Sequence, residues 1–210
     1  IVSNTPVEIG APPARRSGAG GGVLRVVYVG LINPSRGLRT VMEAARLLRD
    51  MGRKFEIKVA GSGKDFRHIA SMVERFGLQK EVQLLGWIDH QRLNDVFANA
   101  DVGLVPHYVC SHWNNTIPNK IFDYMNAGIP VVVSDAIPAR RIVEGPGCGL
   151  WYPDTDGAAL AQRLVQLEDD AVRERYGKNG YQAVVGRYNW QQDRRVLLDS
   201  VASLTNHQLA

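Results

Sequence analysis

The chain has 210 residues, of which 45% are hydrophobic and 22% are charged. This is the composition of a globular protein, and it excludes a disordered chain. No uninterrupted apolar run reaches the roughly 18–20 residues that a membrane helix requires, and the opening residues lack the basic and apolar segments of a secretion signal. We therefore expect neither a membrane span nor export.

The charge balance is mildly basic, with 25 Lys and Arg against 21 Asp and Glu, a net charge of +4. So small an excess suits a phosphate-bearing ligand or an anionic membrane face, and it is equally common on surfaces that bind nothing. The charges form no basic blocks, so we expect no nucleic-acid partner. Cys110 and Cys148 are the only cysteines and match no zinc spacing. Two isolated thiols favour a reducing compartment, the cytoplasm.

The N-terminal region differs in composition from the rest. Residues 11–22 are nearly all Ala, Pro, Gly, Arg and Ser, which predicts a flexible linker because such a segment buries no core. Residues 1–10 are too short for a domain, and we interpret them as the end of a preceding one. The expected organisation is a remnant with its linker over 1–22 and one domain over 23–210.

From residue 23 onward, short apolar runs alternate with helical patterns. The runs predict five strands, at residues 24–30, 55–61, 82–86, 101–106 and 129–135. Apolar residues at helical spacing predict helices that begin near Leu38, Phe66, Asp89 and Ile121. After residue 151 the chain is mainly helical, with segments at about 155–167, 173–181 and 191–204. This alternation predicts an α/β fold, a doubly wound parallel sheet with helices on both faces.

Ligands of open parallel sheets bind at the carboxyl ends of the strands, so the loops there carry the candidate residues. After the first strand, Gly30 permits a tight exit and Ser35 is expected to cap the next helix. Arg36 and Gly37 stand at the start of that helix, where unpaired N–H groups favour a phosphate. The glycine fingerprint of an NAD site is absent. An ordinary turn with a surface arginine is the alternative.

The loop after the second strand contains Gly63 and Lys64, which suggests a nucleoside-triphosphate loop. Such a loop also needs glycine at position 58 and Ser or Thr at position 65. Lys58 and Asp65 stand there instead. We therefore expect a glycine turn.

The segment after the fourth strand is the richest in polar side chains. His107 and His112 lie five positions apart, and no nearby carboxylate completes a metal site, so no metal is expected. Asn114, Asn115 and Thr116 are polar groups clustered before a helix and suited to sugar hydroxyls. The chain has no G-x-S-x-G elbow and no recognisable Ser/His/Asp order, which disfavours a hydrolase.

Further along this segment, Pro118 is suited to a first helical turn. Asn119 and Lys120 then place an amide and a cation at the positive end of a helix, and Asp123 follows one turn later toward the same crevice. A capped helix with solvated polar residues is the alternative. Together with the first loop, the pattern favours a diphosphate flanked by hydroxyl-bearing groups.

Six segments, in order and spacing, resemble one known family. They read VVYVGLINPSRGLRTVMEAARLL, VAGSG, VQLLGWI, ANADVGLVP, PNKIFDYMNAGIPVVVSD and YNWQQ. From Val23 to Leu204 the chain resembles the C-terminal, nucleotide-sugar-binding domain of a family 4 (group 1) glycosyltransferase. The resemblance implies the Rossmann-like half of a GT-B fold.

The resemblance also implies roles for individual residues. The family has two cations on the diphosphate after the first strand; Leu31 replaces the first, and Arg36 keeps the second. Arg36, Lys120 and the helix N-termini are positioned to stabilise the leaving diphosphate. The chain is similar to a subgroup with a P-N-K helix start, so we interpret its departure from the family's first glutamate as variant chemistry. The family's paired glutamates correspond to Asn115, which would meet the donor sugar, and Asp123, which would bind the ribose.

The remaining implied substrate contacts are Gly30, Thr116, Asn119 and the base-binding pair Trp87 and Ile88. The implied reaction is retaining transfer of a sugar from a UDP- or GDP-linked donor, with no cofactor and no metal. It would serve polysaccharide or glycoconjugate biosynthesis in the cytoplasm, at the inner face of the cell membrane.

The resemblance implies an N-terminal acceptor domain, which we expect to be missing from these residues, so we expect the chain alone to be inactive. The helix at 191–204 would normally cross back toward that domain. Two alternatives stay open. One is a sugar-nucleotide epimerase of the same fold, which would need general acid–base residues. The other is a non-catalytic nucleotide-binding module.

Overall fold

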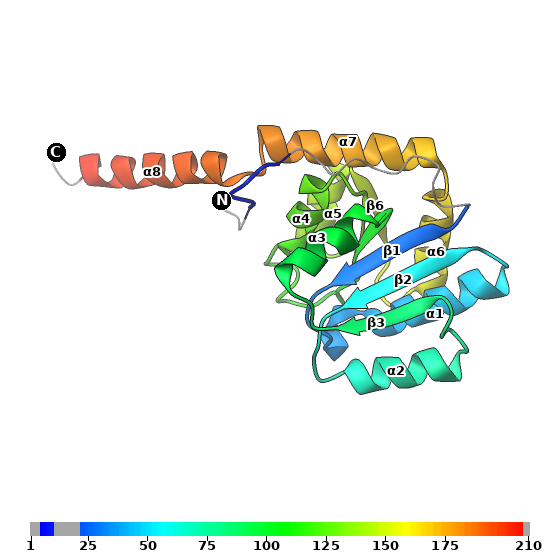
Figure 1. Ribbon diagram of the computed structural model, residues 1–210. Helices are drawn as coiled ribbons and strands as arrows, with labels where there is room; N and C mark the ends of the chain where they lie inside the picture. The colour runs from blue at the N-terminus through cyan, green and yellow to red at the C-terminus, as the bar shows by residue number, and fades with distance from the viewer. Residues whose placement is uncertain (1–4, 11–21, 208–210) are drawn as a thin grey trace.

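The computed structural model describes residues 5–10 and 22–207. Its centre is a six-stranded parallel sheet with the strand order β3-β2-β1-β4-β5-β6 (Figure 1). The strands are β1 (Leu24–Val29), β2 (Phe55–Ala60), β3 (Val82–Gly86), β4 (Val102–Val105), β5 (Val131–Ser134) and β6 (Gly149–Tyr152). The predicted doubly wound α/β fold is confirmed. The order reverses between β1 and β4, which makes this pair the topological switch point.

Helices cover both faces of the sheet. The α-helices of the described residues are α1 (Leu38–Asp50), α2 (Phe66–Arg75), α3 (His90–Ala98), α4 (Lys120–Asn126), α5 (Ile137–Glu144), α6 (Gly157–Gln166), α7 (Asp170–Gly186) and α8 (Trp190–His207). Buried side chains of α1, α2 and α6 join the core on one face, and those of α4 and α5 join the core on the other, with α3 beside them. Helix α7 packs on α4.

The sheet is built as its sequence predicts. Along β1, Val26 and Tyr28 enter one core and Val27 enters the other, because successive side chains of a strand point to opposite faces. Every residue of β4 and β5 is buried, as a parallel sheet covered on both faces requires. The apolar stripe of α1 is buried, and the side chain of Asp89 caps α3 by accepting the N–H of Arg92 at 2.8 Å.

Three details differ from the expectation. The elements α5 and β6 are not predicted by the sequence pattern, since eight and four residues are too few to show a periodicity. Ser35 does not cap α1, because it lies in a short 3₁₀ helix (Pro34–Arg36) and Gly37 is the residue before α1. Pro118 lies before the N-cap of α4 rather than in its first turn.

Residues 5–10 pack beside α7 and the start of α8. The hydroxyl of Thr5 donates to Asp193 at 2.7 Å, and the N–H of Trp190 donates to the carbonyl of Pro6 at 3.0 Å. The phenol of Tyr181 donates to the carbonyl of Gly10 at 3.0 Å. Residues 11–21 of the predicted linker lie outside the described residues, so the proposed division into two parts stays a prediction.

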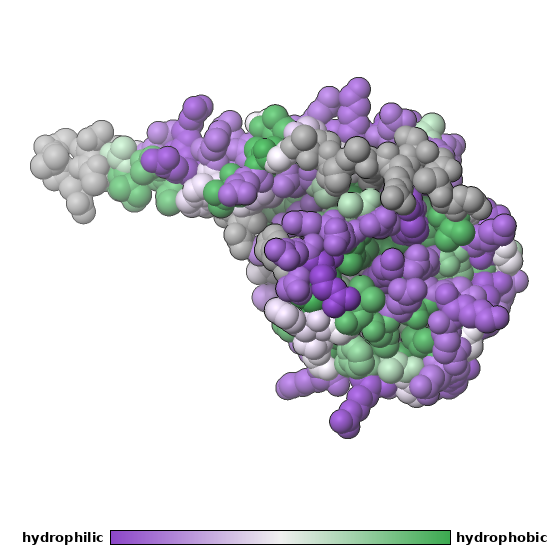
Figure 2. Space-filling model, in the orientation of Figure 1, coloured by the Kyte–Doolittle hydropathy of each residue, from purple (hydrophilic) through white to green (hydrophobic). Residues whose placement is uncertain are grey.

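Helix α8 projects away from the rest of the molecule (Figure 1). Apolar side chains alternate with polar ones along it (Figure 2), and Leu198, Val201 and Leu204 are exposed. Among the residues that the structure describes, no helix is both long and apolar enough to cross a membrane.

Candidate functional site

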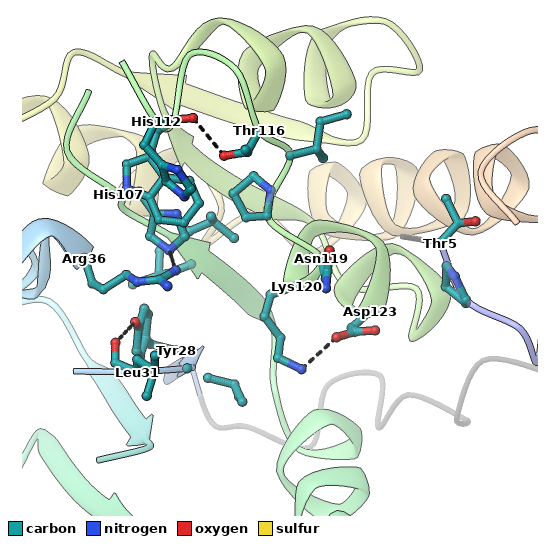
Figure 3. Close-up of a pocket in the computed structure, with 18 residues that line it drawn as sticks. Thr5, Tyr28, Leu31, Arg36, His107, His112, Thr116, Asn119, Lys120 and Asp123 are labelled. Carbon is teal, nitrogen blue, oxygen red and sulfur yellow. Dashed lines mark hydrogen bonds and ion pairs between the residues drawn. The ribbon is translucent and has the colours of Figure 1, made fainter. Parts of the chain in front are cut away.

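A cleft of about 560 Å³ opens at the carboxyl ends of β1 and β4 (Figure 3). This is the switch point of the sheet, the position at which open α/β sheets bind their ligands. Six of the nine predicted site residues line the cleft: Gly30, Arg36, Thr116, Asn119, Lys120 and Asp123. Residues far apart in the chain therefore meet in one place.

Glycine lets the two loops that flank the cleft approach each other. Gly37 has φ = 70°, and a Cβ at this position would lie 1.6 Å from the carbonyl oxygen of Pro106. The N–H of Tyr108 donates to the carbonyl of Ser35 at 3.0 Å. The loop after β1 and the loop after β4 are thus joined directly, which fixes one wall of the cleft.

Arg36 lies on this wall and contacts two stacked aromatic rings, those of His107 and Trp113. Its Nη1 is 3.0 Å from Nε2 of His107, and its guanidinium carbon is 4.5 Å from the centroid of the Trp113 ring. A guanidinium only donates hydrogen bonds, so Nε2 of His107 is the acceptor. Within the described part of the chain, Arg36 makes no ion pair.

His107 is buried under the same cleft, and its ring stacks on Trp113 at a centroid distance of 4.1 Å. Burial lowers the pKa of His107 to about 3, and the nearby Arg36 and His112 contribute to this lowering. The ring is therefore neutral, with its proton on Nδ1. This Nδ1 is buried and has no hydrogen-bond partner among the described residues.

Lys120 and Asp123 lie on the opposite side of the cleft, on the first turn of α4 (Figure 3). Lys120 Nζ is 2.8 Å from Asp123 Oδ2, and the two side chains are 34% and 36% exposed. Residues three apart share one face of a helix, so the expectation that both face the same crevice is confirmed. A pair this exposed contributes about 0–1 kcal/mol, so a ligand can separate it at small cost.

Three predicted site residues lie outside the cleft lining. Asn115 is exposed and its Nδ2 donates to the carbonyl of Ser111 at 2.7 Å. Trp87, 76% exposed, and the half-buried Ile88 follow β3, two strands away from β1. Thr116 does line the cleft, but its hydroxyl donates to the carbonyl of His112 at 2.8 Å.

The structure adds residues that sequence reasoning did not assign to a ligand. Tyr28, Trp113 and His107 all line the cleft. His107 follows β4 almost directly, so its place at a carboxyl strand end could have marked it, although its spacing from His112 suggests only a metal ligand. No sequence signal marks Trp113. Across the described residues, no group of three or more His, Cys, Asp or Glu side chains is arranged to hold a metal ion.

Solved structures share this architecture. The C-terminal domain of LpcC, a glycosyl transferase group 1 family protein from Francisella tularensis, matches with a TM-score of 0.67 at 19% identity over 80% of this chain and 87% of that domain. HepE from Anabaena, solved with UDP and glucose, matches with a TM-score of 0.74 at 16% identity over 90% of this chain and 50% of its own. The fold is the Rossmann-like half of a GT-B glycosyltransferase, as predicted.

The sequence assigns the family. A family model described as glycosyl transferases group 1 matches residues 24–170, and the chain belongs to this family. A similar curated protein is WcaL of Escherichia coli K12, named for colanic acid biosynthesis, which is 29% identical over 153 residues. That match covers 71% of this chain and 38% of WcaL. The chain thus spans less than half the length of this relative.

Proposed function

We propose that this chain is the donor-binding domain of a retaining glycosyltransferase. It would bind a nucleoside-diphosphate-sugar, linked to UDP or GDP, and serve polysaccharide or glycoconjugate biosynthesis without a metal ion. The observation that carries the proposal is the gathering of Arg36, Lys120 and Asp123 around one cleft at the switch point. The UDP and glucose bound to HepE, and the naming of WcaL for colanic acid biosynthesis, support it.

The two cations of the cleft suit a diphosphate. Arg36 offers a planar set of donors and Lys120 a compact charge, and both bind phosphate oxygens well. As the bond to the sugar breaks, negative charge grows on the leaving diphosphate, and fixed cations stabilise this transition state. Gly30 lines the cleft directly after β1, where a Cβ would lie 3.2 Å from the hydroxyl oxygen of Tyr28.

Asp123 suits a ribose, because one carboxylate accepts hydrogen bonds from two neighbouring hydroxyls. In the structure Asp123 pairs with Lys120. A bound nucleotide would replace this ion pair with two charge-assisted contacts, ribose hydroxyls on Asp123 and phosphate oxygens on Lys120. The polar groups of Asn119 and Thr116 lie beside this position and would bind the same ligand.

The base and the sugar would extend beyond the described cleft. Trp87 and Ile88 follow β3 on the same edge of the sheet, and the exposed indole offers a surface for a base. Asn115 would reach the donor sugar once its amide leaves the carbonyl of Ser111. We also retain the proposal that the enzyme works in the cytoplasm, at the inner face of the membrane.

Calorimetric titration of the chain with UDP and GDP, and with UDP- and GDP-sugars, tests this function. We expect at least one nucleoside diphosphate to bind, and the Arg36→Ala/Lys120→Ala variant to lose that binding. Arg46→Ala is the matched control, because Arg46 is half-exposed on α1, pairs with Asp50, and lies outside the cleft. Equal affinity of the cleft variant and the control would contradict the proposal.

We further propose that residues 1–210 fold but transfer no sugar by themselves. The described domain has a complete core on both faces of its sheet. The acceptor domain of the resembling enzymes, which would form the other wall of the active site, has no counterpart in the matched residues. Cooperative thermal unfolding without sugar transfer is the expected result, and transfer by this chain alone would contradict it.

A further inference from the structure

We propose that His107 is a positioning residue. It orients the Arg36 guanidinium in the cleft without neutralising its charge, so that the cation can bind the donor diphosphate. The inference rests on the proposed donor-binding function and adds a residue that acts through Arg36. Figure 3 shows Arg36 and His107 joined beside the cleft, across from Lys120 and Asp123.

The guanidinium is held in two directions. His107 Nε2 accepts from Nη1 at 3.0 Å along the edge of the guanidinium, and the Trp113 ring lies 4.5 Å from its central carbon. Trp113 is itself held between His107 and His112, with ring centroids 4.1 and 4.5 Å away. A long side chain restrained by an acceptor and by a ring loses few conformations when it binds a ligand.

The acceptor is neutral, which preserves the charge of Arg36. A carboxylate in the place of His107 would orient the guanidinium equally well, but it would also cancel the positive charge that a diphosphate needs. Burial keeps the pKa of His107 far below its ordinary value. A neutral imidazole therefore restrains Arg36 and leaves its charge for the ligand.

The backbone around His107 is fixed from three elements. The hydroxyl of Ser134, at the end of β5, donates to the carbonyl of His107. The N–H of Tyr108 donates to the carbonyl of Ser35 at 3.0 Å, and the N–H of Val109 donates to the carboxylate of Asp154 at 2.7 Å. His107 is consequently a fixed support, and Arg36 is the side chain that it aligns.

The hydrogen bond to Arg36 leaves the other ring nitrogen of His107 unsatisfied within the part of the chain that the structure describes. Because Nε2 accepts from Arg36, the proton lies on Nδ1, which is buried without a partner among the described residues. Buried donors are nearly always satisfied in folded proteins, and exceptions gather at functional sites. The unsatisfied Nδ1 is explained if Nε2 is kept for Arg36.

Two amide variants separate the role of Nε2 from that of the buried ring. In His107→Gln the amide reaches the position of Nε2, and in His107→Asn, one methylene shorter, it reaches only the position of Nδ1. We expect His107→Gln to keep the affinity for UDP or GDP, whichever the parent chain binds, and His107→Asn to lose about three- to tenfold. Uridine or guanosine should bind both variants equally. Thermal unfolding of each variant checks that it is folded.

A double-mutant cycle with Arg36→Ala tests whether His107 acts through Arg36. In the Arg36→Ala background, His107→Asn should cause no further loss of diphosphate affinity, because its effect runs through the missing side chain. An equal loss in both backgrounds would overturn the positioning role while leaving the donor site intact. A failure of Arg36→Ala itself to weaken diphosphate binding would overturn both this inference and the assigned role of Arg36. Equal affinities of the Gln and Asn variants would also contradict the inference.

Discussion

The two sides of the cleft hold their cations in opposite ways. On one side Arg36 contacts a neutral imidazole and an aromatic face, so its charge is not compensated within the described residues. On the other side Lys120 is paired with the carboxylate of Asp123, three positions along the same helix. Arg36 is therefore oriented without being neutralised. Lys120 is neutralised by a weak ion pair, which a ligand must break before it can bind the lysine.

This difference shows that what a cation contributes to a site depends on its partner as well as on its residue type. Arg36 can meet an incoming phosphate without breaking an ion pair, whereas Lys120 must first leave Asp123. We therefore expect the diphosphate to depend mainly on Arg36, and the ribose to depend on Asp123. Four predictions test this contrast.

Arg36→Ala should have the largest effect. Losing a hydrogen bond to a charged group costs about 1.5–3 kcal/mol, so affinity for UDP or GDP should fall by a factor of about 10 to 150. The matching nucleoside should bind as before, since it carries no phosphate. Isothermal titration calorimetry with both ligands measures the ratio, and equal losses for the two would contradict the assignment.

The neutrality of His107 predicts a pH dependence of stability. The folded pKa is about 3 and the ordinary value is 6.5. Between these values the unfolded chain binds a proton that the folded chain does not, so the free energy of unfolding decreases as the pH falls. From pH 6.5 to 5 this loss should be roughly 1.5 kcal/mol.

The measurement is urea unfolding of the parent chain and of His107→Gln, which lacks the titrating ring. The difference between their unfolding free energies should change across this window, while other groups titrate alike in both. A constant difference would mean that the folded ring is not held neutral, and that Arg36 faces a second cation at mild acidity.

Asp123→Ala should weaken ribonucleoside diphosphate binding by about tenfold, because two ribose hydroxyls lose a charged acceptor. A 2′,3′-dideoxy analogue lacks those hydroxyls and should bind the variant and the parent chain almost equally. Competition titration with the two nucleotides measures both affinities. If the variant loses both ligands alike, Asp123 supports the fold and does not bind the ribose.

Lys120→Ala should have the smallest effect, a two- to fivefold loss of diphosphate affinity, because exposed charges couple by less than about 1 kcal/mol. Lys64→Ala is the matched control, an exposed lysine in the loop after β2 that does not line the cleft. Calorimetry should rank Arg36→Ala above Lys120→Ala and Lys120→Ala above the control. Equal losses for Arg36→Ala and Lys120→Ala would remove the contrast between the two sides.

Much of the fold could be predicted because its signals are local. The apolar run of β1 and the helical spacing of α1 appear within a few residues of sequence, and the side-chain cap of Asp89 is a contact over three positions. The short elements α5 and β6 carry too few residues for such a signal. Their places depend on packing against β5 and α7.

Part of the candidate site could also be predicted from local sequence, namely the residues in the loops that follow the strands. The rule that ligands bind at carboxyl strand ends gives Gly30, Arg36 and Lys120 from sequence alone. The loop from β4 to α4 has no periodicity, and its path is set by distant contacts such as Val109 to Asp154, 45 positions apart. The place of Asn115, outside the cleft lining and bonded to Ser111, could not be predicted for that reason.

The sequence by itself determined the alternation of strands and helices, the family, and the residue types at the strand ends. It also determined the pairing of Lys120 with Asp123, since helical geometry brings side chains three positions apart together. The partner of Arg36 was decided only by tertiary structure. His107 lies 71 positions away, and the two meet because β1 and β4 are neighbours in the sheet although β2 and β3 separate them along the chain.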